Sequence, residues 1–174
     1  MKVIILAGGL GTRLPEYTKK IPKPMVKVAG YPIIVHLMKH YIISGFKEFF
    51  LATGYKSKEF KKYFKNYKKD GKSFEATIFN KKCKVTILDT GLKTLTGGRL
   101  KKAVKYLKTQ EDFMFTYGDG LSNVNLNKLL KFHKRHGKKI TVTAVRPPAR
   151  FGELKLKNNL VNSFKEKPQV GTGW

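Results

Sequence analysis

The chain of 174 residues has little cysteine and few acidic side chains. Because Cys83 is the single cysteine, an internal disulfide is excluded and no cysteine pair can begin a zinc site, so we expect a small buried side chain in or near a strand. No apolar run approaches the ~18 residues of a membrane span, and the apolar start is too short for a signal peptide. These absences predict one cytoplasmic domain over residues 1–174, with no membrane partner.

Positive charge is in large excess: the chain has 37 Lys and Arg residues and 11 Asp and Glu residues, which give a formal net charge of +26. Such a balance favours phosphorylated ligands or nucleic acid. Only five of the basic residues are arginine and the lysines are spread over the whole chain, whereas proteins that read bases concentrate arginine and aromatic residues on one face. A solvated lysine-rich surface is the favoured interpretation, and a basic nucleic-acid-binding module is the alternative.

Apolar runs of strand length alternate with segments of helical period along the chain. The pattern predicts strands over residues 2–7, 48–55, 84–90, 112–120 and 139–145, helices over 32–44, 58–67, 99–108 and 125–136, a hairpin over 152–165 that turns at KNN, and an exposed loop over 68–74. Strands that alternate with helices indicate an α/β fold, in which a mostly parallel sheet carries helices on both faces.

In such a sheet, ligands bind beyond the carboxyl ends of the strands, so the turns there are the first place to look for a site. The first strand is followed by GGLGTR, residues 8–13. Its glycines let backbone N–H groups approach a phosphate closely, and Arg13 adds a planar fork of donors. The turn is not a dinucleotide fingerprint, because Leu14 stands where the third glycine is needed, and it lacks the GK[ST] of a P-loop. A glycine turn that merely punctuates a loop is the alternative.

Two further segments bring charges to the same region. In IPKPM, Pro22 and Pro24 are expected to hold Lys23 in extended backbone, which would fix its ammonium group for a phosphate. In FTYGDG, Asp119 follows an apolar strand between two glycines. One carboxylate together with phosphates is a common way to hold Mg²⁺, and an Asp-Gly turn without a ligand is the alternative.

Several segments together resemble a known family. GGLGTRLPEYTKKIPKPM is similar to the signature of the sugar-1-phosphate nucleotidyltransferases, the nucleotide-diphosphosugar pyrophosphorylases. LDTGLKTLTGGRLKKA, MFTYGDG, FHKRHGKK and FKEKP resemble more closely the glucose-1-phosphate cytidylyltransferases within it, and the likeness runs from the first residue to the last. The resemblance implies a Rossmann-like three-layer fold with a mixed, mostly parallel sheet. It also implies an Mg²⁺-dependent in-line reaction in which CTP and α-D-glucose 1-phosphate give CDP-glucose and pyrophosphate.

The resemblance also implies roles for individual residues, carried over motif by motif. The nucleotide and its triphosphate would be bound by Leu6, Ala7, Gly8, Gly9, Gly11, Thr12, Arg13, Lys23, Thr96, Arg99 and Gly118. Catalysis would rest on Arg13, Lys23 and Asp119, with Asp119 as the metal ligand. The sugar phosphate would be bound by Gly152, Glu166 and Lys167. The attacking phosphate oxygen is already anionic at neutral pH, so positioning and charge neutralisation suffice and no general base is required.

The sequence leaves three points open: the base of the nucleotide, the completeness of the site and the assembly of the chain. Spacing alone does not separate CTP from UTP or dTTP, so a related pyrimidine-nucleotide transferase is an alternative. The resemblance places a second metal-binding aspartate and further elements of the sheet beyond Trp174, so we expect a chain that is truncated at its C-terminus, binds CTP with Mg²⁺ and turns over slowly. A homo-oligomer is implied for the full-length family, and the assembly of this chain is left open.

Overall fold

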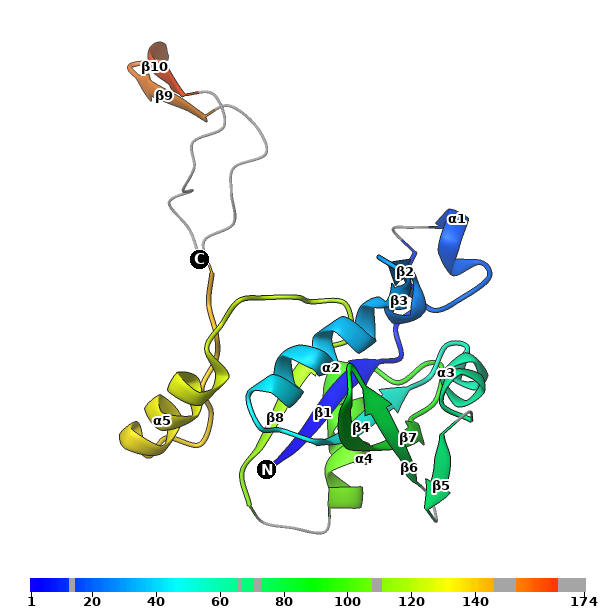
Figure 1. Cartoon of the computed structure of the whole chain (residues 1–174). Helices are drawn as coiled ribbons and strands as arrows, with labels where there is room; N and C mark the ends of the chain where they lie inside the picture. Colours follow the sequence, from blue (N-terminus) through cyan, green and yellow to red (C-terminus); the bar gives the residue numbers. More distant parts are fainter. Residues whose placement is uncertain (13–14, 66, 71–72, 108–110, 146–152, 166–174) are drawn as a thin grey trace. The chain divides into compact units, whose positions relative to one another are not determined.

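A computed structural model describes residues 1–12, 15–65, 67–70, 73–107, 111–145 and 153–165 (Figure 1). The chain divides into two compact units, Met1–Leu129 and Leu130–Trp174, and each is described by itself. A single catalytic domain over residues 1–174 stays a prediction. The elements are β1 (Lys2–Ala7), α1 (Pro15–Thr18), the 3₁₀ turn η1 (Lys23–Met25), β2 (Lys27–Val28), β3 (Tyr31–Pro32), α2 (Ile33–Ile43), β4 (Glu48–Thr53), α3 (Ser57–Phe64), β5 (Lys68–Asp70), β6 (Ser73–Ile78), β7 (Lys81–Asp89), α4 (Thr96–Leu107), β8 (Phe113–Tyr117), α5 (Leu126–His136), β9 (Glu153–Lys157) and β10 (Leu160–Lys165).

The first unit is built on a six-stranded sheet with the strand order β5-β6-β7-β4-β1-β8 (Figure 1). β1 runs parallel to both of its neighbours, with Ile5 opposite Leu51 of β4 and opposite Thr116 of β8. β7 is parallel to β4, whereas β6 is antiparallel to β7 and β5 is antiparallel to β6. The predicted mixed, mostly parallel sheet is therefore confirmed.

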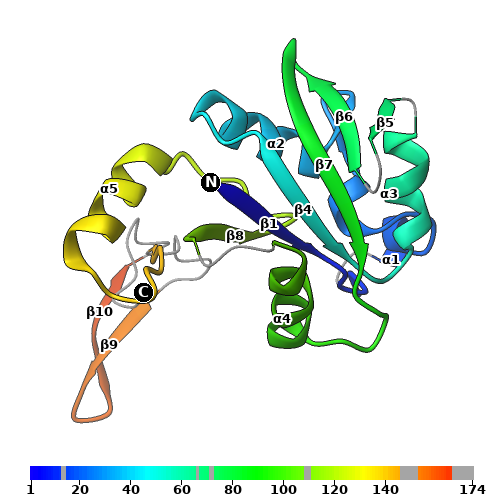
Figure 2. The same ribbon diagram turned by 90° about the horizontal axis from the view of Figure 1, so that it is seen from below.

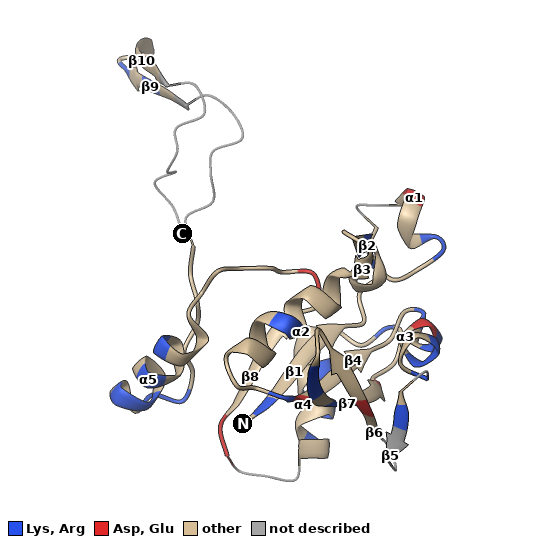
Figure 3. Cartoon of the chain, viewed as in Figure 1, with Lys and Arg blue, Asp and Glu red and all other residues tan. Residues whose placement is uncertain are grey.

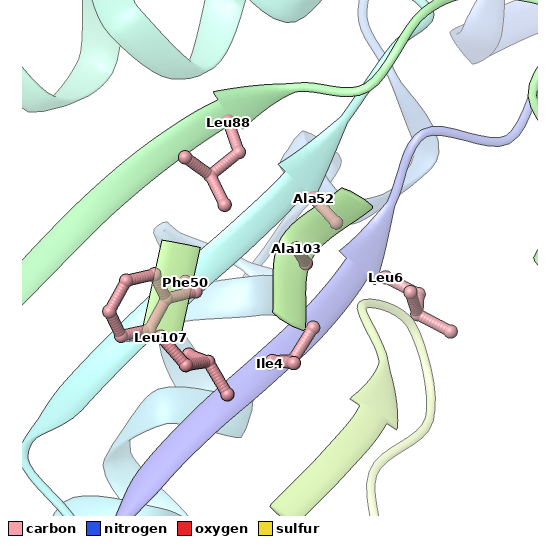
Figure 4. Close-up of a cluster of buried hydrophobic side chains, with 7 residues drawn as sticks. All are labelled: Ile4, Leu6, Phe50, Ala52, Leu88, Ala103 and Leu107. Atoms are coloured by element: carbon pink, nitrogen blue, oxygen red, sulfur yellow. The ribbon is translucent and has the colours of Figure 1, made fainter. Parts of the chain in front are cut away.

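Helices cover both faces of this sheet, which gives three layers (Figure 2). Successive side chains of a strand point to opposite faces. On one face, a buried apolar cluster joins the strands to α4 (Figure 4), and it consists of Ile4, Leu6, Phe50, Ala52, Leu88, Ala103 and Leu107. On the other face, the ring of Tyr41 in α2 meets that of Phe49 at 6.5 Å, and the hydroxyl of Ser57 in α3 lies 2.8 Å from that of Thr53. Burial on both faces explains why β1 and β4 are continuous apolar runs.

The helix predicted over residues 32–44 is confirmed as α2. Pro32 precedes the first turn, where its missing N–H costs no helical hydrogen bond, and Gly45 adopts a φ of +95° directly after the last turn. The side chains that this helix buries recur at three- and four-residue spacing, and they are Ile34, Val35, Leu37, Met38, Tyr41 and Ile42. The other predicted helices are also present, although α3 ends three residues early and α4 begins three residues early.

The prediction of an exposed loop over residues 68–74 is wrong. β5 and β6 pair in antiparallel fashion, with Lys68 opposite Glu75 and Asp70 opposite Ser73. β6 then continues along β7, and its side chains alternate between buried and accessible, with Ser73, Ala76 and Ile78 buried. The polar composition of the segment indicated a loop, but pairing with β7 and burial of every second or third side chain stabilise a strand.

The predicted strand over residues 139–145 is likewise absent from the part of the chain that the structure describes. Its alternating β-branched residues satisfy the sequence pattern, yet a strand needs a hydrogen-bonding partner, and the side chain of Val142 is 79% exposed. The hydroxyl of Thr141 instead lies 2.7 Å from Nδ1 of His133 and 2.7 Å from Nε2 of His136. The predicted hairpin, in contrast, is confirmed as β9 and β10, with a turn at Asn158 and Asn159.

Lysine and arginine are distributed over helices and strands throughout the described residues (Figure 3). This distribution agrees with a solvated lysine-rich surface. Cys83 is buried in β7 as expected, and burial raises the pKa of its thiol to about 11. None of the described helices has the length and apolarity required to cross a bilayer.

Candidate active site

The candidate site is the edge of the sheet at which four parallel strands end. β1 ends at Ala7, β4 at Thr53 and β7 at Asp89, and these three residues lie in one row of the register. β8 ends at Tyr117, which lies opposite Leu6. The turns that follow these strands therefore emerge side by side, at the edge where open α/β sheets bind their ligands.

The glycine turn after β1 begins with a residue that has no room for a side chain. Gly8 is buried, and its carbonyl accepts hydrogen bonds from Nη2 of Arg99 at 2.9 Å and from the backbone N–H of Tyr55 at 3.3 Å. A Cβ at Gly8 would lie 2.1 Å from Nη1 of Arg99, whereas a Cβ at Gly9 would meet nothing within 4 Å. Gly8 is required for packing, and Gly9 is open to a ligand.

The same turn is held again at Gly11, which adopts a φ of +69° that favours glycine. A Cβ at Gly11 would lie 2.6 Å from Cγ2 of Thr18, and the Thr18 hydroxyl donates a hydrogen bond to the Gly11 carbonyl at 3.0 Å. Between these two anchored glycines, Gly9 and Leu10 are exposed. A ligand can therefore reach the middle of the turn while both ends are fixed by protein contacts.

The segments IPKPM and GDG meet beside this turn. The N–H of Gly118 donates to the Leu6 carbonyl at 2.9 Å, and a Cβ at Gly118 would lie 3.0 Å from Cγ of Pro24. Next to this contact, Nζ of Lys23 lies 2.6 Å from Oδ2 of Asp119, and both side chains are about one third exposed. The two charged residues that the sequence predicts separately are therefore an accessible ion pair.

The backbone of Lys23 differs from the prediction. Pro22 is extended, with φ −68° and ψ 146°, but Lys23 begins the 3₁₀ turn η1, in which the Val26 N–H donates to the Lys23 carbonyl at 3.1 Å. Pro24 occupies one of the first positions of that turn, where a missing N–H breaks no hydrogen bond of the turn. The expected extended conformation of Lys23 is wrong, because the hydrogen bonds of the 3₁₀ turn outweigh the preference of a residue before proline for extended backbone.

Arg99 is almost entirely buried, with 6% of its surface exposed. Its Nη1 donates to the Thr53 carbonyl at 3.0 Å and to the Thr90 hydroxyl at 2.7 Å, and its Nη2 donates to the carbonyls of Gly8 at 2.9 Å and Leu92 at 3.1 Å. Burial lowers the pKa of the Arg99 guanidinium, and the nearby charge of Asp89 acts in the opposite direction. One guanidinium thus ties together the ends of β1, β4 and β7.

Comparison with known proteins shows which family the chain belongs to. A family model described as nucleotidyl transferase matches residues 2–173. Glucose-1-phosphate cytidylyltransferase from Salmonella typhimurium is 46% identical to the chain, and the alignment covers 97% of the chain and 70% of that relative. The chain belongs to the nucleotidyl transferase family. The family predicted from the sequence motifs is therefore confirmed.

Two further proteins are less similar to the chain. Mannose-1-phosphate guanyltransferase from Gibberella zeae is 33% identical, over 97% of the chain and 45% of that protein. HddC from Yersinia pseudotuberculosis, in a crystal structure with GMP-PN, is 29% identical with a TM-score of 0.67, over 99% of the chain and 72% of its own. The fold is thus shared with HddC, and the sequence likeness extends to a relative whose name refers to a different base.

The remaining predicted site residues fall into three groups in this nucleotidyl transferase. Leu6 and Ala7 are buried at the end of β1. Thr12 and Thr96 are exposed, Thr12 in the glycine turn and Thr96 in the first turn of α4. The predicted residues that lie outside the described part of the chain are Arg13, Gly152, Glu166 and Lys167.

The described residues contain no cluster of three or more His, Cys, Asp or Glu side chains that could hold a metal ion, so a metal ion at this site would be held by fewer protein side chains. Asp119 fits such a role, because it is accessible at the strand edge and its carboxylate oxygens are hard ligands of the kind that Mg²⁺ prefers. The histidines of α2 are bound elsewhere: Nε2 of His36 lies 2.8 Å from the Val28 carbonyl, and that of His40 lies 3.0 Å from the Val124 carbonyl.

Sequence reasoning missed the buried threonines of the site. Thr53 and Thr90 are 0% and 2% exposed, and the Thr90 hydroxyl donates to the Thr53 carbonyl at 2.6 Å. Both follow apolar runs at the carboxyl ends of buried strands. A polar residue in that position is the signal that could have revealed them, because buried hydroxyls require partners.

Proposed function

We propose that the chain transfers a cytidylyl group from CTP to α-D-glucose 1-phosphate, giving CDP-glucose and pyrophosphate. The observation that carries this proposal is the juxtaposition, at one strand edge, of an anchored glycine turn and an accessible Lys23–Asp119 ion pair. The identity of 46% to a protein named glucose-1-phosphate cytidylyltransferase supports the choice of substrates. The predicted substrates and family thus agree with the chemistry that these side chains offer.

The glycine turn is the proposed binding place of the triphosphate. Backbone N–H groups near Gly9 can approach phosphate oxygens without interference from a Cβ, and Arg13 is predicted to add its guanidinium. Lys23 would leave Asp119 and contact the phosphates, which releases the carboxylate for Mg²⁺. Bound Mg²⁺ would supply Lewis-acid neutralisation of the phosphate charge. The ion pair therefore keeps both groups ready at the site before nucleotide binds.

The reaction itself is a displacement at phosphorus. A phosphate oxygen of glucose 1-phosphate forms a bond to the α-phosphorus of CTP, and the bond from that phosphorus to the pyrophosphate oxygen breaks. The nucleophile is already anionic, so no proton has to be removed. The residues of this chain would act by holding two anions in line and by offsetting their repulsion, with Lys23 and Arg13 as the cationic groups.

The remaining assignments complete the proposal. Thr96 is proposed to contact the nucleotide, Arg99 to act on it through the Gly8 carbonyl, and Gly152, Glu166 and Lys167 to bind the sugar phosphate. Both substrates are small charged metabolites, so we place the reaction in the cytoplasm and propose no role for nucleic acid. A homo-oligomeric assembly can be measured by light scattering of the purified chain.

Nucleotide selectivity tests the proposal directly. A ligand that binds the folded state stabilises it by about 2.7 kcal/mol when present at 100 times its Kd. With Mg²⁺ present, CTP should raise the melting temperature more than UTP, dTTP, GTP or ATP at equal concentration. Chromatographic detection of CDP-glucose, together with pyrophosphate release, then measures turnover with glucose 1-phosphate.

Each alternative gives a different result in the same assays. A larger rise in melting temperature with UTP or dTTP than with CTP would mean that the chain uses another pyrimidine nucleotide. A DNA oligonucleotide that stabilises the chain more than every nucleotide, with an effect that falls steeply with salt, would instead support a nucleic-acid-binding module. GTP is included among the compared nucleotides because HddC was crystallised with GMP-PN.

A further inference from the structure

A buried polar network connects the ends of three strands behind the glycine turn. It consists of Thr53 at the end of β4, Thr90 after β7, and Arg99 in α4, which are 0%, 2% and 6% exposed. The Thr90 hydroxyl accepts from Nη1 of Arg99 at 2.7 Å and donates to the Thr53 carbonyl at 2.6 Å. Because this hydroxyl is both donor and acceptor, it fixes the plane of the guanidinium.

The guanidinium fills a space that two glycines leave for it. A Cβ at Gly8 would lie 2.1 Å from Nη1 of Arg99, and a Cβ at Gly54 would lie 2.3 Å from the same atom. Both of its terminal nitrogens donate to protein oxygens, in four hydrogen bonds. Arg99 therefore reaches the site through the Gly8 carbonyl, to which its Nη2 donates.

We propose that Thr90 and Arg99 are positioning residues that preset the glycine turn for phosphate. By holding the Gly8 carbonyl toward the protein interior, the network orients the peptide groups that follow, and Thr18 fixes the other end of the turn at Gly11. A turn ordered before binding loses less conformational freedom when the ligand arrives. The phosphate ligand rests on the proposed function, whereas the ordering of the turn does not.

The first experiment measures the turn without any ligand. Backbone ¹⁵N relaxation would give order parameters for Gly9 and Gly11 in the wild type, in Thr90→Val and in Arg99→Lys. Valine matches the shape of threonine but lacks the hydroxyl, and lysine lacks the planar fork. We expect order parameters of ~0.85 in the wild type and below ~0.6 in both variants.

A matched control separates positioning from a general loss of stability. Thr86 lies in β7, is also buried, and its hydroxyl lies 2.8 Å from that of Ser73. Thr86→Val removes a comparable buried hydrogen bond away from the turn and should leave Gly9 ordered. Thr90→Ser retains a hydroxyl and should restore the order lost in Thr90→Val. Equal order parameters at Gly9 in Thr90→Val and Thr86→Val would overturn the proposal.

The second experiment compares CTP with CMP by calorimetry, at a temperature where every variant is folded. Because the turn is proposed to contact the phosphates beyond the first, Thr90→Val should weaken CTP binding about tenfold while CMP binding changes little. Thr86→Val should alter neither affinity. Equal losses for CTP and CMP would contradict action through the turn. A wild type that binds no nucleotide would instead refute the proposed function, and the relaxation experiment would still decide whether the network orders the turn.

Discussion

The two units of the chain differ in how far their apolar side chains are buried. All of the buried hydrophobic residues that the structure describes lie in Met1–Leu129. In the described part of Leu130–Trp174, the hairpin of β9 and β10 exposes five large side chains by more than half, and they are Leu154, Leu156, Leu160, Val161 and Phe164. An isolated two-stranded hairpin is marginally stable in water at best. The first unit therefore contains the core and, with it, the rigid frame of the candidate site.

The geometry of the candidate site in this nucleotidyl transferase depends on the core of the first unit. The glycine turn, the Lys23–Asp119 pair and the Arg99 network all lie in the first unit. The glycine turn follows β1 and Thr53 ends β4, and both of these strands are buried on both faces. Buried strands fix the positions of the turns that follow them.

The largest effect is expected from removing a core side chain of the first unit. Phe49 of β4 is 0% exposed, so Phe49→Ala should lower the free energy of unfolding by about 3–5 kcal/mol through lost burial and a residual cavity. Leu156 of β9 is 64% exposed, so Leu156→Ala should change the free energy of unfolding by less than about 0.5 kcal/mol. Urea titrations of both variants measure the contrast. A loss of more than about 2 kcal/mol in Leu156→Ala would mean that the hairpin belongs to the cooperative core.

A smaller effect is expected where the core meets the site. In Gly8→Ala, the new methyl group would displace Arg99 from its hydrogen bonds, and hydrogen bonds to a charged group contribute about 1.5–3 kcal/mol each. We therefore expect a loss of about 3 kcal/mol in unfolding free energy, together with weaker CTP binding. Gly9→Ala is the matched control, because nothing lies within 4 Å of its Cβ, and its stability should stay near that of the wild type. Similar melting temperatures for the two variants would argue against the close packing of Arg99 on the turn.

The sequence predicted the strands and turns of this site better than their internal contacts. Apolar runs that end in glycine located β1 and β8, and so brought Gly8, Gly118 and Asp119 to one edge. Nothing in IPKPM distinguished a 3₁₀ turn from an extended segment, because the φ of proline suits both. The four oxygen partners of Arg99 were also out of reach of sequence reasoning, since they come from segments as far apart as Gly8 and Leu92.

The same limits explain the two errors in the fold. Residues 68–74 are polar enough for a loop, but pairing with the neighbouring strands decides their conformation. Residues 139–145 have a strand pattern, yet no strand forms there in the described residues. In both segments, the deciding factor is a partner elsewhere in the chain, which local pattern does not specify.

The third prediction concerns the metal ligand. Asp119→Asn should reduce CTP affinity about tenfold when Mg²⁺ is present and leave it nearly unchanged when Mg²⁺ is absent, because the amide lacks the charge of the carboxylate. The unfolding free energy of Asp119→Asn should be lower than that of the wild type by less than about 1 kcal/mol, since the ion pair with Lys23 is partly exposed. Glu75→Gln in β6 removes a carboxylate at a distance from the turn and serves as the control. Calorimetric titrations with and without the metal measure the effect, and an equal metal dependence in Asp119→Asn and wild type would reduce Asp119 to a turn residue.

The smallest effects should come from two hairpin turns, one in each unit. Asn80, between β6 and β7, has a φ of +62°, and Asn159, between β9 and β10, has a φ of +63°. Alanine tolerates this left-handed backbone less well than asparagine does, at a cost of about 1 kcal/mol. Asn80→Ala should lower the global unfolding free energy by that amount, because its turn joins two strands of the central sheet. Asn159→Ala should leave the global unfolding free energy unchanged, since it strains a hairpin whose large apolar side chains are exposed. A shift equal to that of Asn80→Ala would show that the two units unfold as one.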